Sequence, residues 1–278
     1  MATMQDIEKR IDSIATTRQI AQAMKLVSNT KIRRARELME ASRPFADEAH
    51  ALVRSVADAL DYREGPLFER DPQGSTLYIV TGSDRGLCGA YNINICKFAY
   101  EQIMEATDPY VMTIGVKPQE YFARRGVPIV ESYRGISQNP FFLDGRIVGD
   151  HALELFFSGR VQRVVLVYSR FESLLSHEPT ALPLLPLPTA EGGDRAMELE
   201  PAGDELLKAL LPTYMQAHIF AALAEGAACE QSARITSMDA AVRNCTDLVD
   251  KLQMEYNQAR QSAITQELNE IISGAQIL

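Results

Sequence analysis

DIEKRIDSIATTRQIAQAMKLVSNTKIRRA, residues 6–35, carries the pattern that decides the fold. Its apolar residues recur at alternating gaps of three and four, a spacing typical of one face of an α-helix. The pattern continues to about Leu60, so the sequence predicts one long amphipathic helix. Pro44 is the only proline in this stretch and predicts a local bend, because it removes one helical hydrogen bond and disfavours helical geometry at Arg43.

A second helical pattern runs from Leu206 to about Ile272, near the other end of the chain. At a rise of 1.5 Å per residue this helix would be about 100 Å long, and a helix of that length needs a partner along it. The first helix supplies the partner. Because the two lie at opposite ends of the sequence, we expect an antiparallel coiled coil. Its seam is rich in alanine, which allows close approach but contributes little buried area per residue.

Between the two helices the period of the apolar residues changes. Short runs rich in β-branched and aromatic residues predict strands, separated by helical stretches. The predicted strands are 77–81, 111–116, 129–133 and 161–168, and the predicted helices are 91–105, 118–125 and 146–157. Alternation of strand and helix predicts a small parallel α/β sheet of the Rossmann-like kind.

The proline-rich piece 173–201 predicts an edge strand followed by a linker into the second long helix. The sequence therefore divides into three predicted segments. Residues 1–62 and 204–278 are the long helices of the coiled coil, and residues 75–190 are the central α/β domain.

Composition excludes several classes of protein. The chain has 278 residues, 46% of them hydrophobic, which is enough for a sizeable core. Its net charge of -9 argues against a protein that coats nucleic acid or an anionic membrane. No apolar run reaches the roughly 20 residues that cross a bilayer. The start carries Asp6, Glu8 and Asp12, unlike an acid-poor transit peptide, so we expect a bacterial or already processed chain.

The residues that often carry chemistry are scattered. The four cysteines include no C-x-x-C pair, so neither a zinc site nor a disulfide framework is indicated, and a reducing cytoplasm is expected. The four histidines have no cysteine or carboxylate at ligand spacing. We find no nucleophile elbow and no H-E-x-x-H motif. The sequence therefore predicts no catalytic residue, no metal and no cofactor.

One loop resembles a phosphate-binding turn. SDRGLCGAYN, residues 83–92, follows the first predicted strand and opens into a helix. Its glycines fit neither G-x-G-x-x-G nor the G-x-x-x-x-G-K-[ST] pattern. Nucleotide binding is one reading, and a structural turn whose glycines permit tight packing is the favoured one.

A basic stretch stands out in the first helix. There is no acidic residue between Asp12 and Glu37, although a solvated helix face usually mixes the signs. The stretch could be a plain surface, or it could face nucleic acid or an acidic protein, and the negative net charge favours the acidic protein. Its basic residues are Arg18, Lys25, Lys31, Arg33, Arg34 and Arg36.

Three motifs resemble one known family. The stretch 6–35 resembles the start of F-type ATP synthase gamma subunits, and YNQARQSAITQELNEIISGAQIL, residues 256–278, resembles their end. SDRGLCGAYN resembles the signature of their middle domain. The three occur in the family's order, and with the helix, α/β, helix layout the resemblance covers nearly the whole chain.

The resemblance implies a central-stalk rotor subunit of a proton-translocating F-type ATP synthase, itself non-catalytic, that couples ion flow to ATP synthesis or hydrolysis. It implies alpha and beta subunits around the coiled coil, and the epsilon subunit and the membrane c-ring near the α/β domain. Nucleic acid is not an expected partner. The implied location is the cytoplasmic face of the bacterial inner membrane, where the chain is peripheral and membrane-associated only through the complex.

The resemblance also implies contact residues. The first set lies where the shaft faces an acidic loop of beta, and consists of Met24, Lys25, Lys31, Arg33, Arg34 and Arg36. The second set lies near the upper end of the shaft, where it meets the ring, and consists of Arg260, Gln261, Thr265 and Glu267.

The chain departs from the family pattern in places. Ala227-Ala228-Cys229-Glu230 and Arg234-Ile235 replace more usual serine-bearing and Arg-Met forms, which bears on local packing. The segment Thr189 to Leu199 is short and has no cysteine, so the thiol regulation of the chloroplast form is not expected.

Two rival interpretations come from other classes of protein. One is an α/β enzyme whose long helices serve only to dimerise it, which requires a pocket with convergent polar groups. The other is a coiled-coil nucleic-acid binder, which requires steep salt dependence of binding. Neither accounts for the two matching ends of the chain.

Overall fold

A computed structural model describes residues 4–60, 67–68, 74–187 and 203–275, with the backbone alone described at 203, 204, 270 and 273–275. The chain groups into two compact units, one made of Met1–Ser28 with Ile235–Leu278 and the other of Asn29–Arg234. The predicted linker 188–201 lies outside the described residues. The division into three domain segments stays a prediction.

The first long helix, α1, is a single element from Met4 to Ala59, with Pro44 inside it. Its buried side chains in the second unit recur at gaps of three and four from Ile32 to Ala46 and resume at Val53, which keeps one narrow stripe against its neighbours. Several members of the stripe are small, and this permits close approach of backbones. The buried residues are Ile32, Ala35, Met39, Ser42, Ala46, Val53, Val56 and Ala57.

The second long helix, α5, spans Gly203–Ala275 and lies beside α1 in both units. The two are antiparallel, because partners on α5 move toward its start as positions on α1 advance. In the second unit Arg43 of α1 pairs with Glu225 of α5. Further along α1 the His50 ring lies 5.5 Å from that of His218. The predicted pair of long antiparallel helices is confirmed.

The segment between α1 and α5 in the sequence forms a five-stranded sheet in the second unit, in the order β3-β2-β1-β4-β5. The strands are β1 (Thr76–Thr81), β2 (Pro109–Ile114), β3 (Ile129–Tyr133), β4 (Arg163–Phe171) and β5 (His177–Leu185). The pairs among β1 to β4 are parallel, whereas β5 pairs antiparallel with β4. The sheet is therefore mixed, not purely parallel as predicted. The connection 172–176 is too short for the crossover that a parallel neighbour needs.

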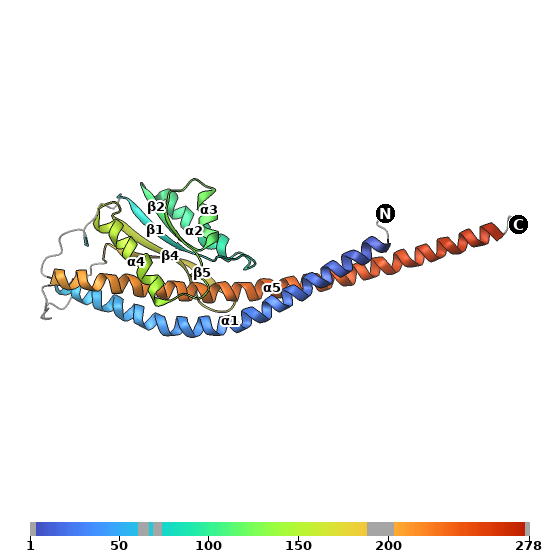
Figure 1. Cartoon of the computed structure of the whole chain (residues 1–278), viewed down its shortest axis with the longest axis horizontal. Coiled ribbons are helices and arrows are strands. Elements are labelled where there is room, and N and C mark those ends of the chain that lie inside the picture. Colours follow the sequence, from blue (N-terminus) through green and yellow to red (C-terminus); the bar gives the residue numbers. More distant parts are fainter. Residues whose placement is uncertain (1–3, 61–66, 69–73, 188–202, 276–278) are drawn as a thin grey trace. The chain divides into compact units, whose positions relative to one another are not determined.

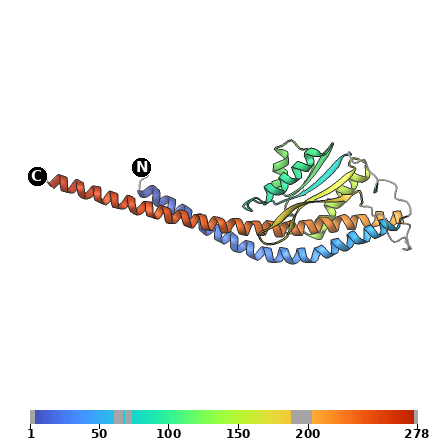
Figure 2. The same ribbon diagram turned by 180° about the vertical axis from the view of Figure 1, so that it is seen from behind.

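Helices cover both faces of the sheet (Figures 1 and 2). They are α2 (Tyr91–Glu105), α3 (Val116–Ala123) and α4 (Phe142–Phe157). Successive residues of β1 point to opposite faces: Leu77 and Ile79 join the core under α4 and α5, and Tyr78 and Val80 join the core under α2 and α3. Strand order and layers are those of a doubly wound fold, which confirms the predicted Rossmann-like α/β domain.

Close packing of α4 on α5 depends on Gly145. A β-carbon there would lie 2.7 Å from the Gln216 carbonyl oxygen of α5, which is backbone and cannot rotate away. We expect Gly145→Ala to lower the free energy of unfolding by about 1–3 kcal/mol, even after the gain in helix propensity of up to about 1 kcal/mol.

Urea unfolding of both variants measures this prediction, with Gly86→Ala as the control. Nothing lies within 4 Å of a β-carbon at Gly86, so this change should stay within about 0.5 kcal/mol of the parent. Equal midpoints for the two variants would contradict close packing at Gly145.

Candidate partner-contact surfaces

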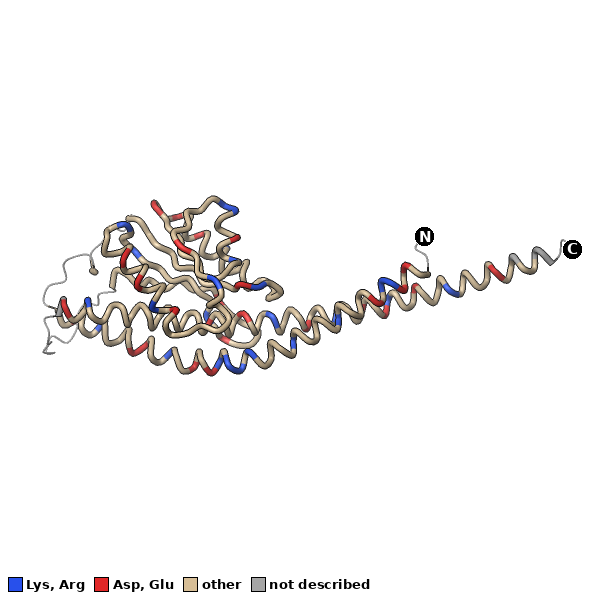
Figure 3. Tube along the Cα trace, in the orientation of Figure 1, with Lys and Arg blue, Asp and Glu red and all other residues tan. Residues whose placement is uncertain are grey.

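The basic stretch of α1 is only partly committed to contacts within the chain. Arg33 pairs with Glu37 and Arg36 with Glu40, each at 3.4 Å and one helical turn apart on the exposed surface. Such exposed pairs contribute about 0.3–0.5 kcal/mol and break easily. Arg34 is exposed and makes no ion pair with any residue that the structure describes. This part of α1 can therefore offer its charge to a partner; Figure 3 marks the charged positions along both long helices.

Lys25 is used differently. Its ammonium donates to the Asp239 carboxylate of α5 at 2.5 Å, and Arg243 holds the other oxygen of the same carboxylate at 2.6 Å. The hydrogen bond from Lys25 lowers the pKa of Asp239, with a smaller contribution from Arg243. Met24 beside it is half-buried. The sequence could not reveal this pairing, because 214 positions separate its partners.

Lys31 begins a chain of polar contacts within the second unit. Its ammonium donates to Gln138 at 3.2 Å, and the Gln138 amide donates to Glu230 at 3.4 Å. Arg234 donates to the same carboxylate at 2.6 Å and to the Gly86 carbonyl at 3.3 Å. Glu230 and Arg234 are 1% and 7% exposed, and burial raises the pKa of Glu230 although Arg234 opposes it. Sequence reasoning singled out Glu230 and Arg234 as departures and missed that they pair.

The loop 82–90 uses its polar groups internally. The Asp84 carboxylate accepts hydrogen bonds from the backbone of Val116 at 3.2 Å and of Gly135 at 3.1 Å, and from the Ser137 hydroxyl at 2.8 Å. The protein's own carboxylate thus takes the backbone donors that a phosphate would need. These contacts support the structural-turn reading of SDRGLCGAYN, because they join the loop after β1 to the segments after β2 and β3.

The second predicted set lies on α5 in the first unit. All four of its side chains are exposed. The Thr265 hydroxyl donates to the Gln261 carbonyl at 2.9 Å, a bond within the helix. Every side chain described from 260 to 269 is exposed, apolar ones included. Ile264 is 49% and Leu268 54% exposed. Apolar groups left in water in this way are typical of a surface that a partner covers.

Comparisons with known proteins identify the family. A family model described as ATP synthase matches residues 3–278. The ATP synthase gamma chain of Desulforamulus reducens is 37% identical over 282 residues, covering 100% of both chains. That of Alkaliphilus metalliredigens is also 37% identical, covering 99% of this chain and 98% of the relative. A chain in an OSCP/F1/c-ring structure of the Euglena gracilis mitochondrial ATP synthase has the same fold, with a TM-score of 0.72 at 20% identity over 98% of this chain and 93% of that one.

The chain belongs to the ATP synthase gamma-chain family. As a gamma chain it is a subunit of the complex and not the catalytic subunit. The resemblance inferred from the three sequence motifs is thereby confirmed.

The two units divide the first predicted contact set and hold the second set within the first unit. Lys31, Arg33, Arg34 and Arg36 belong to the second unit, whereas Met24, Lys25 and the α5 set belong to the first. Both sets stay predictions as contact residues. Among the described residues no group of side chains could hold a metal ion, and no helix there combines the length and apolarity of a membrane span.

Two ion pairs on α5 give a matched test of burial in this gamma chain. Glu230–Arg234 and Asp239–Arg243 have the same spacing and the same 2.6 Å separation, but the first pair is buried and the second is exposed. Arg234→Ala leaves a buried carboxylate without its partner and should lower the free energy of unfolding by about 3–5 kcal/mol. Arg243→Ala should cost about 0–1 kcal/mol. Chemical denaturation compares the two, and similar losses would contradict the assigned role of burial.

Proposed function

We propose that the chain is the rotor shaft of a proton-translocating F-type ATP synthase, which transmits torque between the membrane ring and the catalytic ring. Membership of the gamma-chain family carries the proposal. Similarly folded chains occur in a rotor structure of the Euglena gracilis enzyme and in a central stalk and c-ring structure of the Tetrahymena thermophila enzyme. By this proposal the chain performs no chemistry, and ion flow is converted into ATP synthesis or hydrolysis at neighbouring subunits.

The proposed partners are the alpha and beta subunits around the coiled coil, and the epsilon subunit and the c-ring at the α/β domain. Exposed apolar residues of α5 support enclosure by a ring. About half or more of each of these side chains is exposed, and they are Ile264, Leu268, Ile271 and Ile272. We place the chain at the cytoplasmic face of a bacterial inner membrane, attached only through the complex. The bacterial relatives support this location.

The basic stretch of α1 is the proposed contact for an acidic loop of beta. Lys31, Arg33 and Arg34 have exposed side chains, and their interactions within the chain are weak. Lys25 is different, because its pairing with Asp239 also holds the two helices together. A change at Lys25 would therefore mix loss of a partner contact with loss of helix pairing. A test of the proposed contact should leave Lys25 unchanged.

Reversing three charges together tests the contact and the function. One exposed pair is worth about 0–1 kcal/mol, so a single change should do little. Lys31→Glu, Arg33→Glu and Arg34→Glu together place like charges opposite each other and should impair assembly or coupling. The assay reconstitutes the complex in vesicles and measures proton-driven ATP synthesis, which the parent chain should support.

The matched control neutralises the same three side chains without reversing them, as Lys31→Gln, Arg33→Gln and Arg34→Gln. It places no like charges opposite each other and leaves the α/β domain unchanged, so it should retain more coupled synthesis than the reversed variant. Full synthesis by the reversed variant in normally assembled complex would rule out the proposed contact. Failure of the parent chain to support any coupled synthesis would rule out the rotor function.

The polar set on α5 gives a second test. The side chains of Arg260 and Gln261 make no hydrogen bond or ion pair with a described residue, so replacing both with alanine should leave the stability of the free chain nearly unchanged. Charge-assisted hydrogen bonds to a ring would contribute about 1.5–3 kcal/mol, so the ATPase rate per assembled complex should fall about tenfold or more. Lys251→Ala with Gln253→Ala is the control, since it also removes one exposed basic side chain and one exposed amide from the same helix. Equal rates for the two variants would argue against a special role for Arg260 and Gln261.

A further inference from the structure

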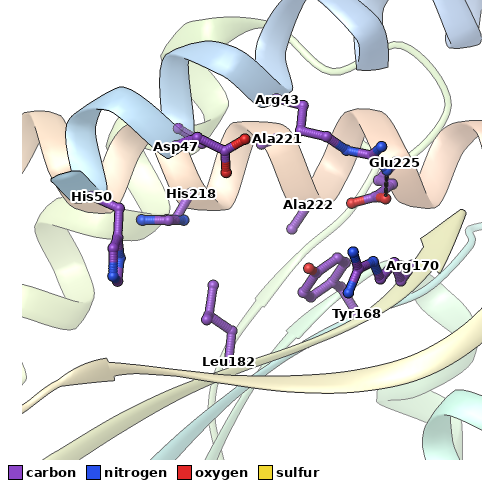
Figure 4. A pocket seen from close by; sticks show the side chains of 11 residues that line it. Arg43, Asp47, His50, Tyr168, Arg170, Leu182, His218, Ala221, Ala222 and Glu225 are labelled. Atoms are coloured by element: carbon purple, nitrogen blue, oxygen red, sulfur yellow. Dashed lines mark hydrogen bonds and ion pairs between the residues drawn. The ribbon is translucent and has the colours of Figure 1, made fainter. Parts of the chain in front are cut away.

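A pocket of about 380 Å³ lies in the second unit, walled by α1 and α5 on one side and by β4 and β5 on the other (Figure 4). We call it the helix–sheet pocket. Its volume falls in the range of small-molecule sites. None of the predicted partner-contact residues lines it, so any role it has is separate from the rotor contacts.

One ion pair closes an end of the helix–sheet pocket. The Arg43 guanidinium of α1 donates to the Glu225 carboxylate of α5, and the same carboxylate accepts a hydrogen bond from the backbone nitrogen of Phe171 at 3.1 Å. Glu225 is buried, and the Arg43 guanidinium balances the negative charge of its carboxylate. These two opposite charges therefore neutralise each other and leave the rest of the lining to set what the pocket attracts.

Two further charged side chains, of opposite sign, face the pocket without an ion-pair partner among the described residues. Asp47 reaches it from α1 and Arg170 from β4, on opposite walls (Figure 4). Neither side chain makes an ion pair or hydrogen bond with a residue in the described ranges. Both act on the Tyr168 hydroxyl, although less than burial and Glu225, which raise its pKa: Arg170 lowers that pKa, and Asp47 raises it slightly. The pocket thus presents a negative wall, a positive wall and a protonated hydroxyl between them.

A buried imidazole adds a third polar feature. His218 is 8% exposed, and its Nε2 atom has no hydrogen-bond partner among the residues that the structure describes. Burial, together with nearby His50, lowers the pKa of His218 to about 4. At neutral pH the ring is therefore uncharged and offers one donor and one acceptor. A buried polar atom without a partner is costly, which favours a ligand that supplies one.

We propose that the helix–sheet pocket binds a small zwitterion of the α-amino-acid class with an aliphatic side chain. Arg170 and the Tyr168 hydroxyl donate to its carboxylate, Asp47 accepts from its ammonium group, and His218 supplies a further polar contact. The aliphatic part lies on Leu182 and the neighbouring alanines of α5. An anion alone would face the charge of Asp47, and a cation alone would face that of Arg170. Only a molecule with both charges satisfies the two walls.

Ligand-observed NMR with the purified full chain tests the proposal with three probes of one shape. L-leucine carries both charges, isocaproate lacks the ammonium group and isoamylamine lacks the carboxylate. We expect saturable binding of L-leucine, with each single-charge probe weaker by about tenfold. No detectable binding of L-leucine, or equal binding of the three probes, would overturn the proposal.

Two variants that each remove one charge identify the walls. Arg170→Gln should weaken L-leucine and isocaproate about tenfold and strengthen isoamylamine, because the opposing positive charge is gone. Asp47→Asn should weaken L-leucine and isoamylamine and strengthen isocaproate, because the opposing negative charge is gone. Lys97→Gln, exposed on α2 and outside the pocket, is the control and should bind like the parent. L-leucine binding that neither pocket variant alters would place the ligand elsewhere and refute the assignment. The readout needs no other subunit, so it is independent of the rotor proposal.

Discussion

The second unit depends on one constraint, which is that α5 is enclosed on all sides from Ala222 to Arg234. Such a helix needs small side chains where its neighbours approach closely. Each charged side chain that it buries also needs a partner of opposite charge. Small residues such as Ala224, Ala227 and Ala228 meet the first need, since they pack directly on α1. Ion pairs meet the second need within this segment. The charges are therefore part of the packing, because an apolar seam alone would not specify which stretch of α1 lies beside which stretch of α5.

The same helix changes character after residue 234. In the first unit no described side chain beyond Met238 is buried, and the apolar ones from Ile264 onward are largely exposed. The free energy of local unfolding is lower where a segment has fewer buried apolar contacts, so stability along α5 should fall toward its end. One continuous helix thus combines a buried segment with a segment whose apolar side chains are largely exposed. A shaft that is anchored in its own domain and acts inside another assembly needs this combination.

The sequence predicted the elements well and the contacts poorly. Helix 91–105 and strand 129–133 match α2 and β3 at both ends, because their periodicity is clear and turn residues flank them. The buried stripe of α1 was harder to predict. Leu52 fits the apolar spacing yet is 48% exposed, whereas Val53 beside it is 4% exposed, since the position of the sheet and α5 selects the face. The enclosed part of α5 has no polar face, so periodicity could not reveal the roles of Glu225 and Glu230. Pairings such as Lys25 with Asp239 join positions that only the fold brings together.

The loop 82–90, which carries most of the SDRGLCGAYN motif, explains how a doubly wound domain can serve a mechanical role. Ligands of such sheets usually bind beyond the carboxyl ends of the strands, where the loop after the first strand lies. Here Asp84 fills that region by binding the backbone after β2 and β3. The loop and the start of α2 also reach α5, where Arg234 donates to Gly86 and the Tyr91 hydroxyl donates to the Gly226 carbonyl at 3.2 Å. The loop and helix start that lie beside the ligand in nucleotide-binding sheets here fasten the domain to its long helix. Under the proposed rotor function, these hydrogen bonds are a route by which force on the domain reaches the helix.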